Sequence, residues 1–232
     1  EHEVLVGDCL GAAGLPSLAD KSVDSFLLDP PYSDRTHLGF GRETRFDGTA
    51  AKGDIPFAAL LSEHQARVAA EIARLTRRWV VVFTDDMGVQ GWVGALSTAG
   101  LFHFCTGQWL KIGPMPRMAG DGPAYGTEQI VIARSVGLGR SRWNGGGKAA
   151  VWTARPESGE HPTQKPIALM EQLVKDFTDP GELVCDPFAG IGSTGYIALK
   201  RGRRFVGSEL KESYVRAALR NLAMIQENAT QQ

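Results

Sequence analysis

Apolar residues along the chain form two alternating patterns, short continuous runs and longer stretches with a helical period. A short run bounded by turn-forming residues is typical of a buried strand, whereas apolar residues that recur every three or four positions are typical of an amphipathic helix. The runs predict strands at 4–6, 23–28, 79–84, 101–110, 129–133, 182–186 and 204–209, and the periodic stretches predict helices from about 62, 166, 194 and 211. Strands that alternate with helices predict an α/β fold with a parallel, doubly wound sheet, whose ligands bind at the carboxyl ends of the strands.

Three of the predicted helices have an apolar face that should pack against the sheet. Ser62 can cap the first helix, and Pro166 can occupy the first turn of the second. The predicted inward residues are Val68, Ile72 and Leu75 in the first helix, Ile167, Met170, Val174 and Phe177 in the second, and Val215, Leu219, Leu222 and Ile225 in the last.

Composition adds that the chain is an ordinary globular protein. Its 232 residues are enough for one sizeable core, so we expect a single domain over 1–232. The apolar fraction of 43% and the formal net charge of −1 exclude a disordered chain and a general polyanion binder. The apolar runs are too short to span a membrane and the first residues do not resemble a signal peptide, so a cytoplasmic location is expected. The three cysteines and five histidines are scattered, which predicts reduced thiols and no metal site.

Two stretches interrupt the alternation of strands and helices. Residues 33–56 are polar, contain glycine and follow directly on a predicted strand, which is where an active-site loop belongs. Residues 113–159 are rich in glycine, proline and arginine. Within them, the segment 135–156 has four basic side chains and no acidic one, which is typical of a surface that binds an anionic partner.

A glycine-rich loop lies between a predicted strand and a predicted helix near the end of the chain. Gly190, Gly192 and Gly195 have the spacing G-x-G-x-x-G, which lets the backbone approach a ligand beside the free amides of a helix N-terminus. Glu209 ends the next strand, where a carboxylate can accept hydrogen bonds from ribose hydroxyls. A nicotinamide-dependent oxidoreductase and a methyltransferase fit this motif equally well.

A second motif, Asp29-Pro30-Pro31-Tyr32, follows an apolar strand in the first part of the chain. The two prolines stiffen the segment and remove backbone donors, so the Pro30 carbonyl can face outward beside the Asp29 carboxylate. Two adjacent acceptors could hydrogen-bond the N–H groups of an exocyclic base amine and localise its lone pair, while the aromatic ring stacks on the base. The motif therefore favours methyl transfer to an amino group of a base taken out of its duplex.

These motifs together resemble the β-group of DNA amino-methyltransferases, in which the catalytic motif precedes the cofactor motif. The tetrapeptide at 29–32 is similar to the family's catalytic motif, 186–195 to its cofactor loop, 161–166 to a third family motif, and 7–10 to the segment that reads the cofactor's adenine. The resemblance implies a Rossmann-like, seven-stranded methyltransferase sheet, circularly permuted, in a single domain with a short recognition insertion at 113–159. It also implies S-adenosyl-L-methionine as the cofactor.

The resemblance assigns a role to each matching position. Asp29, Pro30, Pro31 and Tyr32 are then catalytic. The threonine and lysine of the third motif hold the carboxylate of the cofactor's methionine, and Asp8 accepts a hydrogen bond from its adenine. The full set of implied cofactor-binding residues is Asp8, Cys9, Thr163, Lys165, Asp186, Phe188, Gly190, Gly192, Ser193, Thr194 and Glu209.

The implied partner is double-stranded DNA. We expect phosphate contacts from the basic residues of the recognition insertion, with a merely solvated loop as the alternative. In that alternative the DNA would lie on Arg35, Arg42 and Arg45 of the earlier loop. The expected phosphate-binding residues are Arg140, Arg142, Lys148 and Arg155.

The residue at the first position of the tetrapeptide predicts which base carries the target amine. Asp29 favours N6 of adenine, since relatives that methylate N4 of cytosine more often have serine there. Methylation of cytosine, of RNA or of a protein amide, and a module without catalytic activity, remain alternatives. The short recognition insertion is compatible with low specificity, with a homodimer and with either a solitary enzyme or a restriction-modification enzyme.

Overall fold

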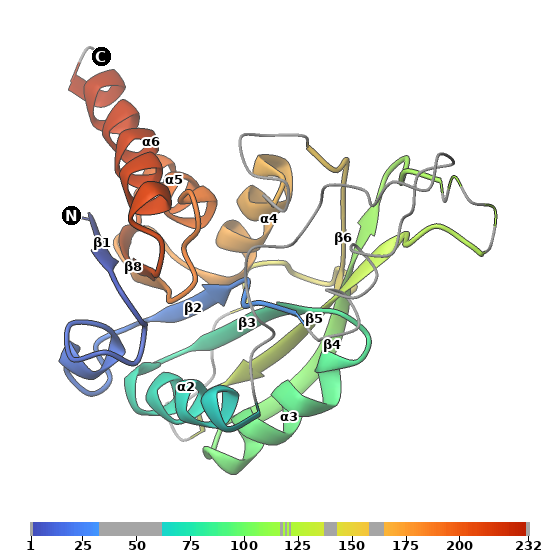
Figure 1. Ribbon diagram of the computed structural model, residues 1–232, viewed down its shortest axis with the longest axis horizontal. Helices are drawn as coiled ribbons and strands as arrows, with labels where there is room; N and C mark the ends of the chain where they lie inside the picture. The colour runs from blue at the N-terminus through green and yellow to red at the C-terminus, as the bar shows by residue number, and fades with distance from the viewer. Residues whose placement is uncertain are drawn as a thin grey trace, which may run out of the picture.

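The chain forms a single sheet covered by helices on both faces (Figure 1). The computed structural model describes residues 2–32, 62–116, 118, 120, 122–136, 143–157 and 165–230, with side chains up to residue 225. Helices α2 (Ser62–Leu75) and α3 (Gly88–Thr98) cover one face, and α4 (Ile167–Phe177), α5 (Ser193–Lys200) and α6 (Glu212–Thr230) cover the other. A short 3-10 turn, η1 (Leu15–Ser17), follows the first strand.

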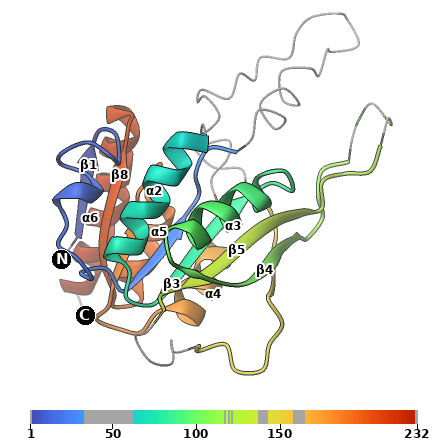
Figure 2. The same cartoon turned by 90° about the horizontal axis from the view of Figure 1, so that it is seen from below.

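The sheet has eight strands in the order β1-β8-β7-β2-β3-β5-β4-β6. Adjacent strands are parallel except at β5, which runs antiparallel to both of its neighbours, β3 and β4. Figure 2 shows the sheet with β1 and β8 at one end and the long β4–β5 hairpin at the other. The strands are β1 (His2–Val6), β2 (Ser25–Leu28), β3 (Trp79–Thr84), β4 (Phe102–Lys111), β5 (Thr127–Arg134), β6 (Val151–Ala154), β7 (Leu183–Asp186) and β8 (Arg204–Glu209).

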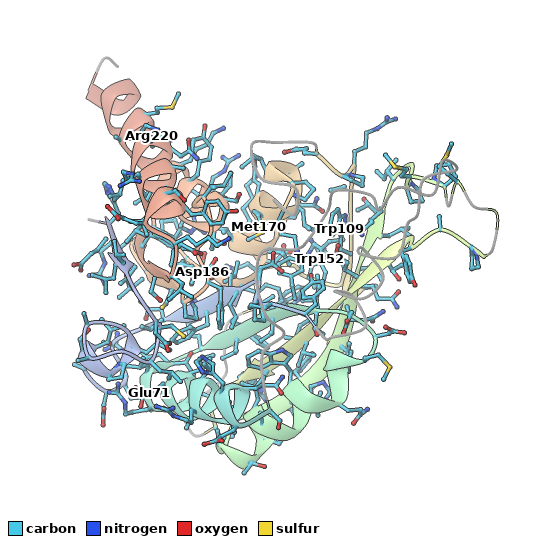
Figure 3. All side chains as sticks on the ribbon, viewed as in Figure 1. Glu71, Trp109, Trp152, Met170, Asp186 and Arg220 are labelled. Carbon is cyan, nitrogen blue, oxygen red and sulfur yellow. The ribbon has the colours of Figure 1, made fainter. Side chains whose placement is uncertain are left out.

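Two features correct the sheet expected from the sequence. The sheet is mixed and not fully parallel, because β5 returns directly from β4 as a hairpin instead of crossing over through a helix. It also has eight strands where the resemblance implied seven, and β6 lies within the stretch 113–159 that was expected to be an insertion. Trp152 of β6 pairs with Trp109 of β4, and Figure 3 shows the two side chains close together. Both indoles are buried, which gives this edge strand its packing.

The core consists of two apolar clusters, one on each face of the sheet. Strand β3 contributes to both, because its side chains alternate between the faces. Val81 and Phe83 pack on the face of α4, α5 and α6, whereas Val80 and Val82 pack on the face of α2 and α3. All six residues of β3 are buried, as expected for a central strand covered on both faces.

The apolar face of α6 differs from the face predicted from its sequence. Val215 and Leu222 are buried as predicted, but Leu219 is 41% exposed and Ala218 is fully buried. The reason is a close approach to the glycine-rich loop: a Cβ added at Gly192 would lie 3.1 Å from the Cβ of Ala218. A leucine does not fit at that contact, so the helix is rotated to present the small side chain. The predicted inward residues of α2, namely Val68, Ile72 and Leu75, are all buried.

Among the residues that the structure describes, no helix combines the length and the apolar character that a membrane crossing requires.

Candidate active site

The predicted functional residues gather along one edge of the sheet. Strands β1, β8, β7 and β2 are neighbours and parallel, so their carboxyl ends lie side by side. Asp8 follows β1, Glu209 ends β8, Asp186 ends β7 and Asp29 follows β2. The Asp29 tetrapeptide (29–32) and the glycine-rich loop, which are far apart in sequence, therefore occupy neighbouring strand ends, where ligands bind in folds of this class.

The three glycines of the loop have different structural roles. Gly190 and Gly192 have φ values of 53° and 88°, in the left-handed backbone region that residues other than glycine rarely adopt. Gly192 caps the N-terminus of α5, and the space in front of the Gly190 Cα is open. Gly195 instead lets α5 pack closely on the sheet, because an added Cβ would lie 2.6 Å from the Phe205 ring. The open space at Gly190 is where a ligand can approach the backbone.

Glu209 is fixed by the same loop. Its Oε2 accepts a hydrogen bond from the Gly190 amide at 3.1 Å, and its Oε1 accepts one from the Lys211 amide at 2.9 Å. Its main-chain carbonyl accepts a bond from the Gly7 amide at 2.9 Å, which ties β8 to the segment after β1. Each carboxylate oxygen has more than one acceptor position, so Glu209 can still accept hydrogen bonds from two neighbouring hydroxyls of a ligand.

Asp186 is a buried carboxyl at the start of the loop. Its Oδ1 accepts from the Phe188 amide at 3.0 Å and its Oδ2 from the Thr194 hydroxyl at 2.7 Å. Burial raises the pKa of Asp186 to about 7, against the lowering effect of these two bonds, and the charges of Asp29 and Glu209 raise it further. A cationic group brought to this edge would favour the ionised form of Asp186.

Asp8, Cys9 and His64 form a small polar group at the β1 end of this edge. Asp8 is exposed and its Oδ1 accepts from the Leu10 amide at 2.9 Å. The Cys9 side chain is buried in the core, and burial together with the negative charge of Asp8 raises its pKa to about 12. The fold brings the His64 Nε2 of α2 to 3.9 Å from the Asp8 Oδ1. One atom of each of the three side chains, of a kind that can ligate a metal ion, then lies within 4.8 Å of the other two. This proximity could not be predicted from the sequence, because His64 is distant from Asp8 along the chain.

The Asp29 tetrapeptide (29–32) contributes to a half-buried ionic cluster that we call the Lys165 cluster, defined as Asp29, Tyr32, Lys111, Glu128 and Lys165. The Lys165 Nζ lies 2.7 Å from Asp29 Oδ2 and 3.2 Å from Glu128 Oε2. The Tyr32 hydroxyl donates to Glu128 Oε2 at 2.6 Å, and the Lys111 Nζ lies 2.9 Å from Glu128 Oε1. Lys165 also lies 5.1 Å from the centre of the Tyr32 ring, within cation–π range.

The two carboxyl groups of this cluster, Asp29 and Glu128, have pKa values shifted in opposite directions. Burial raises the pKa of Glu128, but the charges of Lys165 and Lys111 outweigh it and lower that pKa to about 2. Burial raises the pKa of Asp29, the charge of Lys165 lowers it and the charge of Glu128 raises it, with a net rise. Glu128 is thus the carboxyl held more firmly as an anion, because it has two cationic partners and Asp29 has one. Burial, then the charges of Asp29 and Glu128, raise the pKa of Tyr32, which stays a neutral phenol.

Neither Glu128 nor Lys111 was predicted from the sequence. Lys111 ends β4 without belonging to a motif, and Glu128 lies at the amino end of its strand and not at a carboxyl end. Strand β5 is antiparallel to β3, so its amino end lies at the same edge of the sheet as the carboxyl ends of β2 and β3. Thr84, the last residue of β3, pairs with Gln129, and Glu128 lies one residue beyond it. The signal in the sequence was a glutamate just before the apolar run at 130–133, and it could be used only once the direction of that strand was known.

The structure places the other predicted residues as follows. Lys165 is 8% exposed and faces Asp29 and Glu128, whereas the resemblance assigned it to the cofactor's carboxylate. Phe188 is half-buried against the core, Ser193 and Thr194 begin α5, and Pro30 and Pro31 continue from Asp29. The loop at 33–56, Arg35, Arg42, Arg45, Thr163, Arg140 and Arg142 lie outside the described residues.

Two of the predicted phosphate-binding residues are described, and they differ. Lys148 forms an ion pair with the buried Asp176, which also accepts a 2.7 Å hydrogen bond from the Trp152 indole. Lys148 therefore supports the packing of β6 against α4. Arg155 follows β6 and is exposed.

The chain resembles known methylases in comparisons of sequence and of structure. Residues 138–220 match the model of the N6/N4 DNA methylase family. The protein YubD of Escherichia coli (strain K12) is 50% identical over 66 residues, an aligned part that spans 28% of this chain and only 29% of that protein. The Type II methyltransferase M2.DpnII of Streptococcus pneumoniae is 26% identical over 240 aligned positions, which cover 90% of this chain and 85% of that protein.

The fold is shared with solved structures. The crystal structure of the M1.HpyAVI–SAM complex aligns with a TM-score of 0.71 and 23% identity, over 96% of this chain and 100% of that one. The likeness therefore extends through the strands that form the candidate site.

Proposed function

We propose that this chain, which is similar to DNA methylases in sequence and in fold, transfers a methyl group from S-adenosyl-L-methionine to the exocyclic amine of a base in DNA. The observation that carries the proposal is the position of the Asp29 tetrapeptide. It follows β2, which is hydrogen-bonded to β7, the strand that leads into the glycine-rich loop. A methyl donor bound at the loop and an amine held at Asp29 would then lie at adjacent strand ends.

The residues of the loop fit the proposed cofactor in shape and in charge. The open space at Gly190 admits a ligand to the backbone, and the Glu209 carboxylate beside it suits the two hydroxyls of a ribose. Asp8, Asp186 and Glu209 make this edge acidic, which suits a ligand with a sulfonium and an ammonium group. When bound, S-adenosyl-L-methionine supplies an electrophilic methyl group.

Asp29 and Tyr32 provide the groups that act on the target base. The Asp29 carboxylate and the Pro30 carbonyl would accept the two N–H groups of the amine, so that its lone pair localises and points at the methyl group. Transfer would form the N–C bond while the bond between the methyl group and the sulfonium sulfur breaks and leaves its electron pair on sulfur. The amine nitrogen would then lose one proton, for which the Asp29 carboxylate is the nearest acceptor. The Tyr32 ring would stack on a base extruded from the duplex, and its hydroxyl bond to Glu128 fixes the orientation of that ring.

We propose adenine N6 as the target because Asp29 stands at the first position of the tetrapeptide, where relatives that methylate N4 of cytosine more often have serine. Cytosine N4 is the second candidate, since the matching family includes both chemistries. Arg155, which is exposed after β6, is our proposed phosphate contact among the described residues.

The test is methyl transfer from tritiated S-adenosyl-L-methionine to duplex DNA, RNA and protein, followed by separation of the labelled nucleosides. We expect labelled N6-methyl-2′-deoxyadenosine from DNA and no labelled product from RNA or protein. Asp29→Ala should reduce transfer by at least about a hundredfold, on the order of 3 kcal/mol of transition-state stabilisation. The affinity of the Asp29→Ala variant for S-adenosylhomocysteine should not fall, because the variant lacks the carboxylate that competes with the ligand's own carboxylate for Lys165.

Glu212→Gln is a matched control, since Glu212 lies on α6 and pairs with Arg216 at the surface. It should leave both activity and binding unchanged. Labelled N4-methylcytosine would select the second candidate. Tight binding of a nicotinamide dinucleotide with no response to S-adenosylhomocysteine would contradict the proposed cofactor.

A further inference from the structure

Glu128 is a half-buried carboxylate on which three donors converge. Its side chain is 16% exposed. Its Oε2 accepts from the Tyr32 hydroxyl at 2.6 Å and lies 3.2 Å from the Lys165 ammonium, and its Oε1 lies 2.9 Å from the Lys111 ammonium. An isolated buried charge is costly, but this one is fully partnered and joins two strands to the segment that contains Lys165.

Two of those donors belong to residues next to the proposed chemistry. Tyr32 would stack on the target base, and Lys165 touches Asp29, which would hold the target amine. The hydroxyl is the point through which the Tyr32 ring can be held, because a ring without a polar contact can rotate about its side-chain bonds. The ammonium of Lys165 is shared, at 2.7 Å from Asp29 and 3.2 Å from Glu128.

We propose that Glu128 is a positioning residue of the methyl-transfer site, which fixes the Tyr32 ring through its hydroxyl and prevents Lys165 from pairing with Asp29 alone. The inference rests on the proposed function. Without Glu128, the Lys165 ammonium would pair with Asp29 alone. It would then compete with the N–H groups of the target amine for the Asp29 carboxylate. The hydroxyl of Tyr32 would lose its acceptor, and the ring its orientation.

The proposal has a signature in the pH dependence of activity. Among the described residues, the titratable groups that face Asp29 are Lys165, Glu128 and Tyr32, with Asp186 on the neighbouring strand. The negative charge of Glu128 raises the pKa of Asp29 and the charge of Lys165 lowers it. Replacing Glu128 by a neutral residue removes the first effect and strengthens the second. The acid limb of the kcat profile, below which Asp29 is protonated, should therefore move to lower pH.

The experiment compares Glu128→Gln, Glu128→Ala and Tyr32→Phe with the wild-type protein and with the surface control Glu212→Gln. Glu128→Gln keeps an oxygen that can accept the Tyr32 hydroxyl but loses the charge. We expect kcat to fall by about tenfold in Glu128→Gln and by about a hundredfold in Glu128→Ala, so the amide partly rescues the loss. The acid limb should shift in Glu128→Gln and stay in place in the control.

A double mutant tests whether Glu128 acts through the hydroxyl. Once Tyr32→Phe has removed the donor, Glu128→Ala can remove only the part of the effect that acts through Lys165. The loss in the double mutant should therefore be smaller than the product of the two single losses. Losses that multiply, or an acid limb that does not move in Glu128→Gln, would overturn the proposal.

Failure of this inference is distinct from failure of the proposed function. A wild-type protein that transfers no methyl group to DNA contradicts the proposed function. An active wild-type protein whose Glu128→Gln variant has the same kcat and pH profile contradicts the role of Glu128 alone. If Glu128→Ala does not fold, as judged by its thermal melt, Glu128→Gln still decides the question, because it preserves volume and one hydrogen-bond acceptor.

Discussion

The buried carboxyl of Asp186 should make the protein less stable as the pH rises, and Asp186→Asn should remove that dependence. Burial raises the pKa of Asp186 from 3.8 to about 7 in the folded chain. Below pH 4 the carboxyl is protonated in both the folded and the unfolded chain. Between about pH 4 and pH 7 only the unfolded chain ionises, so the free energy of unfolding falls through this window and levels off above it.

The magnitude follows from the shift in pKa. A rise of about three pKa units corresponds to roughly 4 kcal/mol, at 1.36 kcal/mol for each unit. Asparagine does not ionise, yet its amide can accept from the Phe188 amide and donate to the Thr194 hydroxyl, which preserves both contacts of Asp186. Relative to wild type, Asp186→Asn should therefore gain roughly 4 kcal/mol between pH 4 and pH 8, or about 8–16 °C in Tm for a chain of this size.

The assay is urea or thermal denaturation of the protein without cofactor at a series of pH values. Asp20→Asn is the matched control, since the Asp20 side chain is 75% exposed in the loop before β2. The stability difference between Asp186→Asn and wild type should grow with pH, and the difference for Asp20→Asn should be nearly flat. A stability difference that is the same at pH 4.5 and pH 8 would refute the reasoning, because the Asp186 carboxyl would then not carry a raised pKa.

Two further predictions concern side chains of the site and of the basic segment. Tyr32→Phe keeps the stacking face but loses the bond to Glu128, so methyl transfer should fall by about tenfold, whereas Tyr32→Ala should lose about a hundredfold; equal kcat values for the two variants would assign the whole role to the hydroxyl. Lys148→Ala should lower the free energy of unfolding by about 1–3 kcal/mol, because it leaves the buried Asp176 without its cation; denaturation measures this loss. Arg155→Ala should change the free energy of unfolding by less than about 0.5 kcal/mol and reduce the slope of log K against log salt concentration for DNA binding by about one unit. Binding titrations at several salt concentrations measure that slope, and an unchanged slope for Arg155→Ala would place the phosphates elsewhere.

The parts of the fold with strong local patterns could be predicted from the sequence. Strand β3 is an uninterrupted apolar run and is buried along its whole length, and α2 has a clear helical period. Helix α3 was missed because Gly88, Gly91 and Gly94 weaken its helical propensity, and only Trp92 and Leu96 of its residues are buried. That helix depends on its tertiary contacts, which no local pattern contains.

The candidate site residues that belong to a continuous sequence motif were predicted, whereas those that only folding brings together were not. The Asp29 tetrapeptide and the glycine-rich loop are short, continuous segments with distinctive residues. Glu128 and Lys111 belong to no such segment. Glu128 reaches Tyr32 and Lys165 only because β5 reverses the direction of the sheet, and Lys111 joins the site through its ion pair with Glu128. The partner of Lys165 likewise depends on strand order, since Asp29 lies 136 residues away in sequence.

The order of strands in the sheet also has a consequence for the way the chain folds during synthesis. Strand β1 pairs with β8, roughly 200 residues later, and β2 pairs with β7 on one side. At about 5–20 residues per second, the ribosome needs roughly 10–40 s after β1 to produce β8, and slightly less after β2 to produce β7. Until then the apolar strand β2 has an unpaired edge, which can bind another nascent chain. Chaperones that shield such an edge should therefore raise the yield of folded protein more than substitutions that stabilise the finished sheet.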